Sequence, residues 1–237
     1  MTPFAAIRAR AASRKGGEAA LAALMPKIQP LSALTAMADS RFLAEMSKRI
    51  FCSGFVWSVI EKKWPGFEEA FLGFEPMALL HRPPDYWDAL TADKRIVRNG
   101  QKIMSVARNA QFIADIAAVH GSFGRFLADW PVDDEAGLLD LLAKRGNRLG
   151  GNTGQMFLRF VGRDGWVLSR DVVLCLRDAG LDIAEQPGSK RDMARIQDCF
   201  NGWARESGLP YTHLSRICAM SIGENYSAEQ IAERMGD

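Results

Sequence analysis

The sequence predicts an all-α fold built from amphipathic helices. In several segments of the 237 residues, apolar side chains recur every three or four positions, as they do on the buried face of a helix. Alternation with a period of two is scarce, and its best example, residues 165–168, is too short to found a sheet. Apolar residues make up 48% of the chain and charged residues 24%, which are the proportions of a folded globular protein.

The main helices can be placed from their apolar stripes. These stripes lie within residues 103–117, 155–161, 193–203 and 214–222. The third stripe stops before Gly208-Leu209-Pro210, a combination that typically ends a helix. The fourth follows Thr212, whose hydroxyl is suited to cap a helix. Because stripes of this kind usually face a core, we interpret all four as core-forming.

Breaks in the pattern suggest three segments. Residues 1–38 are Ala-rich and basic and are expected to form a helical arm. Residues 39–135 are rich in aromatic side chains and are expected to form a helical lobe. Residues 136–237 hold a Gly-rich turn between two helices, followed by the last helices. No internal repeat is visible in the sequence.

Charge and hydropathy exclude several classes of protein. Thirty basic and 28 acidic residues give a net charge of +2, so any DNA-binding face must arise from local clustering of cations. No uncharged run approaches the ~18 apolar residues that a membrane-spanning helix needs. The basic residues near the N-terminus are not followed by an apolar segment, which argues against secretion. We therefore expect a cytoplasmic protein, associated with the nucleoid if it binds DNA.

The cysteines and histidines do not suggest a metal site. The four cysteines lie far apart with no C-x-x-C pair, which favours free thiols in a reducing compartment. The three histidines are also scattered, and His213 and Cys218 are five positions apart, which is off a single helical face. We expect no metal, no cofactor and no obligate protein partner.

One segment combines glycines and cations in a way that suits phosphate binding. Residues 141–145 form the end of an apolar helix with Lys144 and Arg145 as its last residues, and a second helix is expected to begin near Asn152. The Gly-rich turn between them carries Arg148. Glycines allow close approach of the backbone, and a helix N-terminus attracts phosphate. The alternative is an ordinary corner between two helices, with a glycine cap and cations at a helix C-terminus.

Several separated motifs resemble the 3-methyladenine DNA glycosylase I family. They occur in the family's order over roughly residues 39–175, and together they are more specific than any one of them. They comprise Gly54-Phe55-Val56-Trp57, Glu61-Lys62-Lys63, Phe67, Ala70-Phe71, Phe74-Glu75-Pro76, Arg95-Ile96-Val97-Arg98, Lys102-Ile103, Asn109-Ala110, and residues 142–151 with Phe157. The resemblance implies a two-lobed, all-α member of the helix-hairpin-helix glycosylase superfamily that binds damaged duplex DNA and extrudes one nucleotide.

The resemblance also implies roles for particular residues. Trp57 stands where the family places an aromatic side chain that lines the base pocket, and a purine could stack on it. Phe55 and Glu45 are further candidates for that pocket, whereas filling the core is the alternative role of Trp57. The expected DNA contacts are Lys144, Arg145, Gly146, Arg148, Gly150, Gly151, Thr153, Arg98 and Lys102.

The sequence departs from the family at its most important carboxylate. The family has a Glu five residues before the Gly of its Gly-x-x-Trp motif, and Arg49 stands at that position here, or Lys48 if the alignment is shifted by one residue. At about 4 Å and an effective dielectric constant of about 20, reversing a charge changes its interaction with a cationic base by roughly 4 kcal/mol in each direction. Either Arg49 points at DNA phosphate or the pocket does not receive a cationic purine. The family's zinc-binding Cys and His pairs and its aromatic N-terminal segment are missing as well.

Asp171 and Arg49 are the candidate catalytic residues. In most members of the superfamily an Asp follows the hairpin by some twenty residues, where it stabilises the oxocarbenium-like sugar. Asp171 falls about two residues from that position. Alternatively, Asp171 is an ordinary residue in the first turn of a helix that Ser169 caps.

These observations lead to three functional hypotheses. The first is a monofunctional DNA glycosylase of base-excision repair that removes a damaged purine, with an alkylated purine as the expected substrate. The second is a non-catalytic DNA-binding protein of the same fold that senses damaged or distorted DNA, which the Arg at position 49 favours. The third is a helical protein-interaction module in which the Gly-rich turn is only a corner.

Overall fold

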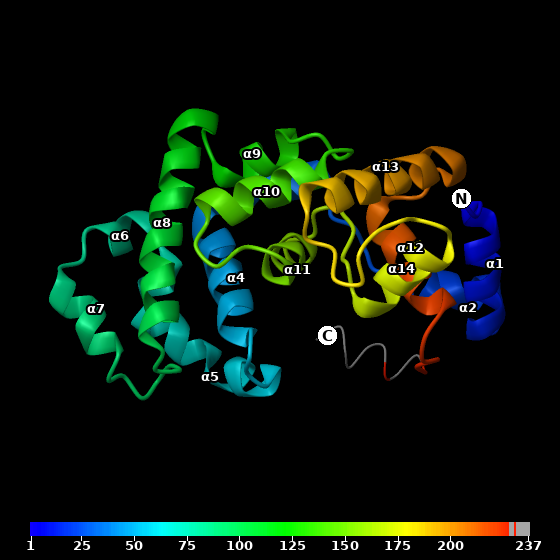
Figure 1. The fold of residues 1–237 in the computed structure, drawn as a ribbon. Helices are drawn as coiled ribbons and strands as arrows, with labels where there is room; N and C mark the ends of the chain where they lie inside the picture. The colour runs from blue at the N-terminus through cyan, green and yellow to red at the C-terminus, as the bar shows by residue number, and fades with distance from the viewer. Residues whose placement is uncertain (228–229, 231–237) are drawn as a thin grey trace. The chain divides into compact units, whose positions relative to one another are not determined.

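The computed structural model describes residues 1–227 and residue 230 (Figure 1). Every regular element in this part of the chain is a helix, so the predicted all-α fold is confirmed. Residues 165–168, the best strand candidate in the sequence, form no strand. None of the described helices combines the length and the apolar character needed to cross a membrane.

The chain divides into two compact units that are each assembled from separate stretches. The central unit comprises residues 29–131 and 137–163, and the terminal unit comprises residues 1–28, residues 132–136 and the chain from residue 164 onward. This division differs from the three segments expected from the sequence. The Gly-rich turn joins the central unit instead of the C-terminal helices, because the helix after it packs on a helix near residue 45.

The central unit is built around two long helices. Its helices are α3 (Leu31–Ala36), α4 (Asp39–Cys52), α5 (Trp57–Ala70), η1 (Leu72–Phe74), α6 (Pro76–Leu80), α7 (Pro84–Leu90), α8 (Gly100–His120), α9 (Phe123–Asp129), α10 (Glu135–Arg145) and α11 (Asn152–Phe160), with α10 starting just before the unit does. In Figure 1, α4 lies beside α8, and α11 also packs against α4. Phe51, Phe67 and Phe71 are fully buried and their rings contact one another, and the ring of Phe71 also contacts Phe74 of η1. The predicted 103–117 stripe is the buried face of α8.

The terminal unit joins the two ends of the described chain. Its helices are α1 (Phe4–Lys15), α2 (Glu18–Ala23), α12 (Arg170–Asp178), α13 (Lys190–Ser207) and α14 (Tyr211–Ser221). Helix α14 packs against both α1 and α12. Trp166 is fully buried and stacks on Phe200, with ring centroids 5.8 Å apart. The segment expected to be an N-terminal arm, residues 1–38, is therefore divided: residues 1–28 belong to this unit, and the rest, with α3, belongs to the central unit.

Two of the predicted helix ends can be checked in the terminal unit. Gly208 adopts a left-handed conformation with φ of 68° at the end of α13, as the stop signal predicted. Thr212, in contrast, is not the N-cap of α14, which begins at Tyr211 after Pro210. The carboxylate of Asp164 satisfies this helix end by accepting hydrogen bonds from the N–H groups of Tyr211 and Thr212, at 3.1 and 2.8 Å.

Candidate functional site

The Gly-rich turn is a tight connection between α10 and α11, and we call residues 146–151 the hairpin turn. At Gly146, a Cβ atom would lie 2.7 Å from the carbonyl oxygen of Leu142. At Gly154, in the first turn of α11, it would lie 2.4 Å from the carbonyl oxygen of Leu149. Gly151 has a φ of 58°, which favours glycine. The close approach of the hairpin turn to the two helix ends therefore depends on these small residues.

A buried asparagine on α8 holds the hairpin turn in place. The side chain of Asn109 donates a hydrogen bond of 3.0 Å to the carbonyl oxygen of Asn147 and accepts one of 2.7 Å from its N–H group. Asn109 is completely buried. Sequence reasoning placed Asn109 in a family motif without recognising this role. The pairing fixes the turn to the central unit from a residue 38 positions away in the chain.

Beside the hairpin turn lies a basic pocket of about 220 Å³. It is lined by Ile50, Ser53, Lys102, Arg148, Gly150 and Thr153. Four of these, Lys102, Arg148, Gly150 and Thr153, are expected DNA contacts, so the structure brings them together from α8, the hairpin turn and the start of α11. Arg148 adopts a φ of 61°, uncommon for a residue with a side chain, and hydrogen-bonds Gln101.

Lys102 contributes a buried cation to this pocket. Only 6% of the residue is exposed, and its Nζ donates hydrogen bonds to the carbonyl oxygens of Phe51, at 3.2 Å, and Ser53. Burial lowers the pKa of Lys102, and the neighbouring charge of Arg148 lowers it further. The amine thus satisfies carbonyl groups at the C-terminal end of α4 while keeping one side toward the pocket.

The central unit also contains an aromatic site, formed by Trp57, Phe160, Arg49 and Glu45. Trp57 is the first residue of α5 and Phe160 the last of α11, and their ring centroids are 5.7 Å apart. The guanidinium carbon of Arg49 lies 3.8 Å from the ring centroid of Phe160 and 4.9 Å from that of Trp57. A cation therefore already stacks on the aromatic residue that was expected to receive a base.

Arg49 is held at this position by Glu45, one turn earlier on α4. Its Nε lies 2.6 Å from Oε1 of Glu45, and its side chain is only 3% exposed, whereas that of Glu45 is 21% exposed. Burial raises the pKa of Glu45, and the Arg49 charge opposes this shift. The Nη1 atom of Arg49 is buried and has no hydrogen-bond partner among the described residues. Burial of Arg49 argues against contact with DNA phosphate, the first of its two predicted alternatives.

The remaining predicted DNA contacts on this unit are solvent-exposed. Arg98 lies on the surface before α8, and Arg145 lies over the ring of Phe112 at 5.6 Å. Lys144 forms an ion pair with Asp140 on the same helix. The Phe55 residue, expected in the base pocket, is 41% exposed, and the Nζ of Lys102 lies 4.6 Å from its ring centroid.

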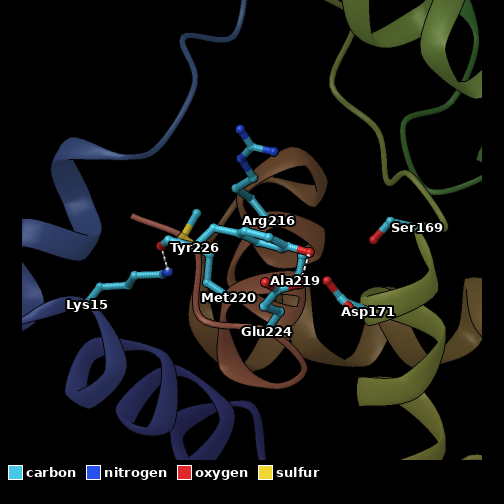
Figure 2. A pocket seen from close by; sticks show the side chains of 8 residues that line it. All are labelled: Lys15, Ser169, Asp171, Arg216, Ala219, Met220, Glu224 and Tyr226. Atoms are coloured by element: carbon cyan, nitrogen blue, oxygen red, sulfur yellow. Dashed lines mark hydrogen bonds between the residues drawn. The ribbon is translucent and has the colours of Figure 1, made fainter. Parts of the chain in front are cut away.

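Asp171 lies in the terminal unit, in the first turn of α12. Ser169 caps this helix by accepting a hydrogen bond of 3.3 Å from the N–H group of Val172. Figure 2 shows the Asp171 carboxylate pointing into a pocket of about 200 Å³. Arg216, Glu224 and Tyr226 are among the other residues that line it. The alternative interpretation correctly predicted the capping geometry.

Two members of the sites were missed by sequence reasoning. Phe160 was assigned to the core stripe of the helix at 155–161, although it is only half-buried and faces Arg49. Asn109 was noted without a role. The sequence carried no signal for Phe160, because the burial of Arg49 and its stacking on this ring join residues that are far apart in the chain. In the described chain no cluster of three or more His, Cys, Asp or Glu side chains could hold a metal ion.

Comparisons with known proteins agree with the predicted resemblance. The methyladenine glycosylase family model matches residues 35–137, which confirms that resemblance. No curated protein matches the chain significantly. A solved 3-methyladenine DNA glycosylase I from Staphylococcus aureus is 25% identical over 53% of this chain and 77% of its own, with a TM-score of 0.47. The 8-oxoguanine DNA glycosylase of Methanocaldococcus jannaschii is 16% identical, covers 81% of this chain and 82% of its own, and has a TM-score of 0.51, so it shares the fold.

Proposed function

Because residues 35–137 match the methyladenine glycosylase family model, we propose that this chain is a monofunctional DNA glycosylase that removes a damaged purine, alkylated purines being the first substrates to test. The observation that carries the proposal is that the family match falls on the unit that also holds the aromatic site and the basic pocket. Such an enzyme would act on nucleoid DNA in the cytoplasm.

The basic pocket supports DNA binding without sequence readout. Lys102 and Arg148 supply positive charge, while Gly150 and Thr153 bring backbone of the hairpin turn and of the first turn of α11 to the same place. Backbone N–H groups and cations that meet at a helix N-terminus favour phosphate. Contacts of this kind position a protein on one DNA strand and leave recognition of the lesion to the base site.

The aromatic site supports capture of an extruded base. The half-buried Trp57 offers a ring on which a purine can stack once it leaves the duplex. In the reaction, the bond between C1′ and the base nitrogen breaks, its electron pair leaves with the base, and water adds at C1′ while losing a proton. A carboxylate can stabilise the oxocarbenium-like sugar and accept that proton. We propose Asp171 for this role because it is the acid that follows the hairpin turn in the sequence, and its carboxylate points into the pocket of the terminal unit.

The proposal is tested by release of free bases from alkylated duplex DNA, resolved by chromatography. Trp57→Ala removes the stacking surface and is expected to reduce release by about 100-fold, because base stacking contributes ~1–3 kcal/mol. Trp57→Phe, the matched control, retains an aromatic ring and is expected to keep most of the activity. Asp171→Asn is expected to abolish release while leaving DNA affinity unchanged. Absence of release by the wild-type protein, beside an active glycosylase in parallel, would contradict the proposal.

A second function is favoured by Arg49, which occupies the aromatic site in place of the family's carboxylate. The chain would then bind damaged or distorted DNA without cutting the glycosidic bond. Both functions predict salt-sensitive DNA binding, because both use the basic pocket. Base release distinguishes them, since only the glycosylase produces free base.

A further inference from the structure

The charge of the aromatic site is opposite to what a cationic base requires. A purine alkylated on a ring nitrogen carries a positive charge, and a nearby carboxylate attracts it while a guanidinium repels it. Here the guanidinium of Arg49 lies within 5 Å of both aromatic ring centroids. Glu45, the carboxylate of the site, is already paired with Arg49 at 2.6 Å. The negative charge of Glu45 is therefore neutralised by Arg49, and the site offers no further carboxylate to a cationic base.

The site also contains an unused hydrogen-bond donor. Nη1 of Arg49 is buried without a partner among the described residues, although a buried donor left unpaired is costly. Arg49 is 4% exposed, so bulk solvent does not reach this atom. A guanidinium only donates hydrogen bonds, so the atom that completes the site must carry a lone pair. Carbonyl oxygens and unprotonated ring nitrogens of an uncharged base have this property.

We propose that Arg49 determines the substrate class by selecting an uncharged damaged purine, to which its Nη1 donates a hydrogen bond, and by rejecting cationic N-alkylated purines. This inference rests on the proposed function for its reaction, but it concerns recognition. The base stacks against the accessible part of Trp57, with Arg49 at its edge. Arg49 is thus a specificity-determining residue, and Glu45 positions it through the ion pair.

Two duplexes of identical sequence provide the test, one with a single 1,N6-ethenoadenine, which is uncharged, and one with a single 7-methylguanine, which is cationic. Affinity is measured on versions stabilised against hydrolysis by a 2′-fluoro substituent, and base release on the ordinary versions. For each lesion, the affinity is divided by the affinity for the undamaged duplex. For the wild-type protein, this ratio is expected to be about tenfold or more higher for 1,N6-ethenoadenine than for 7-methylguanine. A preference for 7-methylguanine overturns the proposal.

Variants at the ion pair separate charge from folding. Arg49→Glu is expected to shift the preference toward 7-methylguanine by about tenfold or more. The preference of Arg49→Met should lie between those of the wild-type protein and Arg49→Glu. Glu45→Arg combined with Arg49→Glu exchanges the two charges and keeps an ion pair, so it serves as the matched control for folding, checked by thermal unfolding. It should share the altered preference of Arg49→Glu. An unchanged preference in the folded variants contradicts the proposal.

The failure of the two proposals can be distinguished. If no duplex loses its base with any variant, the glycosylase function fails, whereas the affinity ratio of the wild-type protein still decides the role of Arg49. If bases are released but the ratio does not depend on Arg49, the glycosylase function stands and the present proposal fails. Should neither variant fold, the sign of the wild-type preference alone decides.

Discussion

At the scale of single residues, the buried polar side chains of Arg49 and Asn109 are stabilised in different ways. Arg49 carries a buried charge, which a protein tolerates only with a close counter-ion or another favourable partner. Glu45 supplies the counter-ion and two aromatic rings supply the rest. Asn109 is neutral, and two hydrogen bonds to a single backbone residue, Asn147, satisfy it. Both side chains use their polar groups to organise a site without facing solvent.

Replacement of Asn109 is expected to loosen the hairpin turn. Asn109→Ala leaves the N–H and carbonyl groups of Asn147 without their partner, so we expect a loss of about 1–3 kcal/mol in the free energy of unfolding. DNA affinity should fall as well, because the turn carries Arg148 and Gly150. Urea denaturation and fluorescence anisotropy with a duplex measure the two effects. Gln111→Ala, at an exposed position of the same helix, should change neither by much. Equal effects of the two variants would contradict this role.

At the scale of elements, the connection between α10 and α11 depends on how closely the hairpin turn approaches the helix ends. The hairpin turn is short, and it can close only where side chains are absent from the contact. Gly154 meets the carbonyl of Leu149, whereas Gly150 has only the Cβ of Ala143 nearby, at 3.7 Å from an added Cβ. Close packing therefore excludes a side chain at Gly154 but not at Gly150, although both glycines lie in the same Gly-rich segment of the sequence.

This difference predicts opposite outcomes for two similar substitutions. Gly154→Ala places a Cβ 2.4 Å from a carbonyl oxygen, and we expect a loss of about 1–3 kcal/mol, exceeding the ~1 kcal/mol that Ala gains over Gly within a helix. Gly150→Ala should change stability by less than about 0.5 kcal/mol, since an ordinary contact of 3.7 Å needs no rearrangement. Thermal and urea unfolding of both variants provide the comparison. A larger loss of stability in Gly150→Ala than in Gly154→Ala would contradict the role assigned to the close contact at Gly154.

At the scale of the whole molecule, DNA binding must come from where charges lie. The net charge of +2 provides little general attraction to a polyanion. The hairpin turn and its flanks concentrate cations, including Arg145 and Arg148, whereas Arg41 and Arg82 lie elsewhere on the central unit. The salt dependence of binding counts the phosphate contacts made.

Removal of the two hairpin cations should therefore reduce that salt dependence. Arg145→Ala combined with Arg148→Ala is expected to lower affinity for all duplexes alike and to reduce the slope of log K against log salt by about 2. Arg41→Ala combined with Arg82→Ala removes the same total charge and should leave the slope nearly unchanged. Anisotropy titrations over a range of salt concentrations measure the slopes. If both pairs of substitutions reduce the slope equally, the attraction of DNA does not come from the hairpin cations. If the wild-type protein binds no DNA at low salt, the hypothesis of a protein-interaction module is favoured instead.

Local patterns in the sequence determined the helical fold and the positions of its main helices. Apolar spacing, a helix-ending glycine and a capping serine act within a few residues, so they can be identified without the folded chain. The sequence also shows a cation at position 49, where the resemblance implies a carboxylate. It further identified Trp57 and the Gly-rich turn, whose residues are adjacent in the chain.

Only the tertiary structure decided how these residues are combined. The stacking of Arg49 on Phe160, the hold of Asn109 on Asn147 and the pocket shared by Lys102 and Arg148 all join residues that are far apart in sequence. The packing of α1 on α14, which makes residues 1–28 of the expected N-terminal arm part of the terminal unit, is another case. Such contacts depend on how complete helices pack, and periodicity within one helix shows which face is apolar but not which helix will cover it.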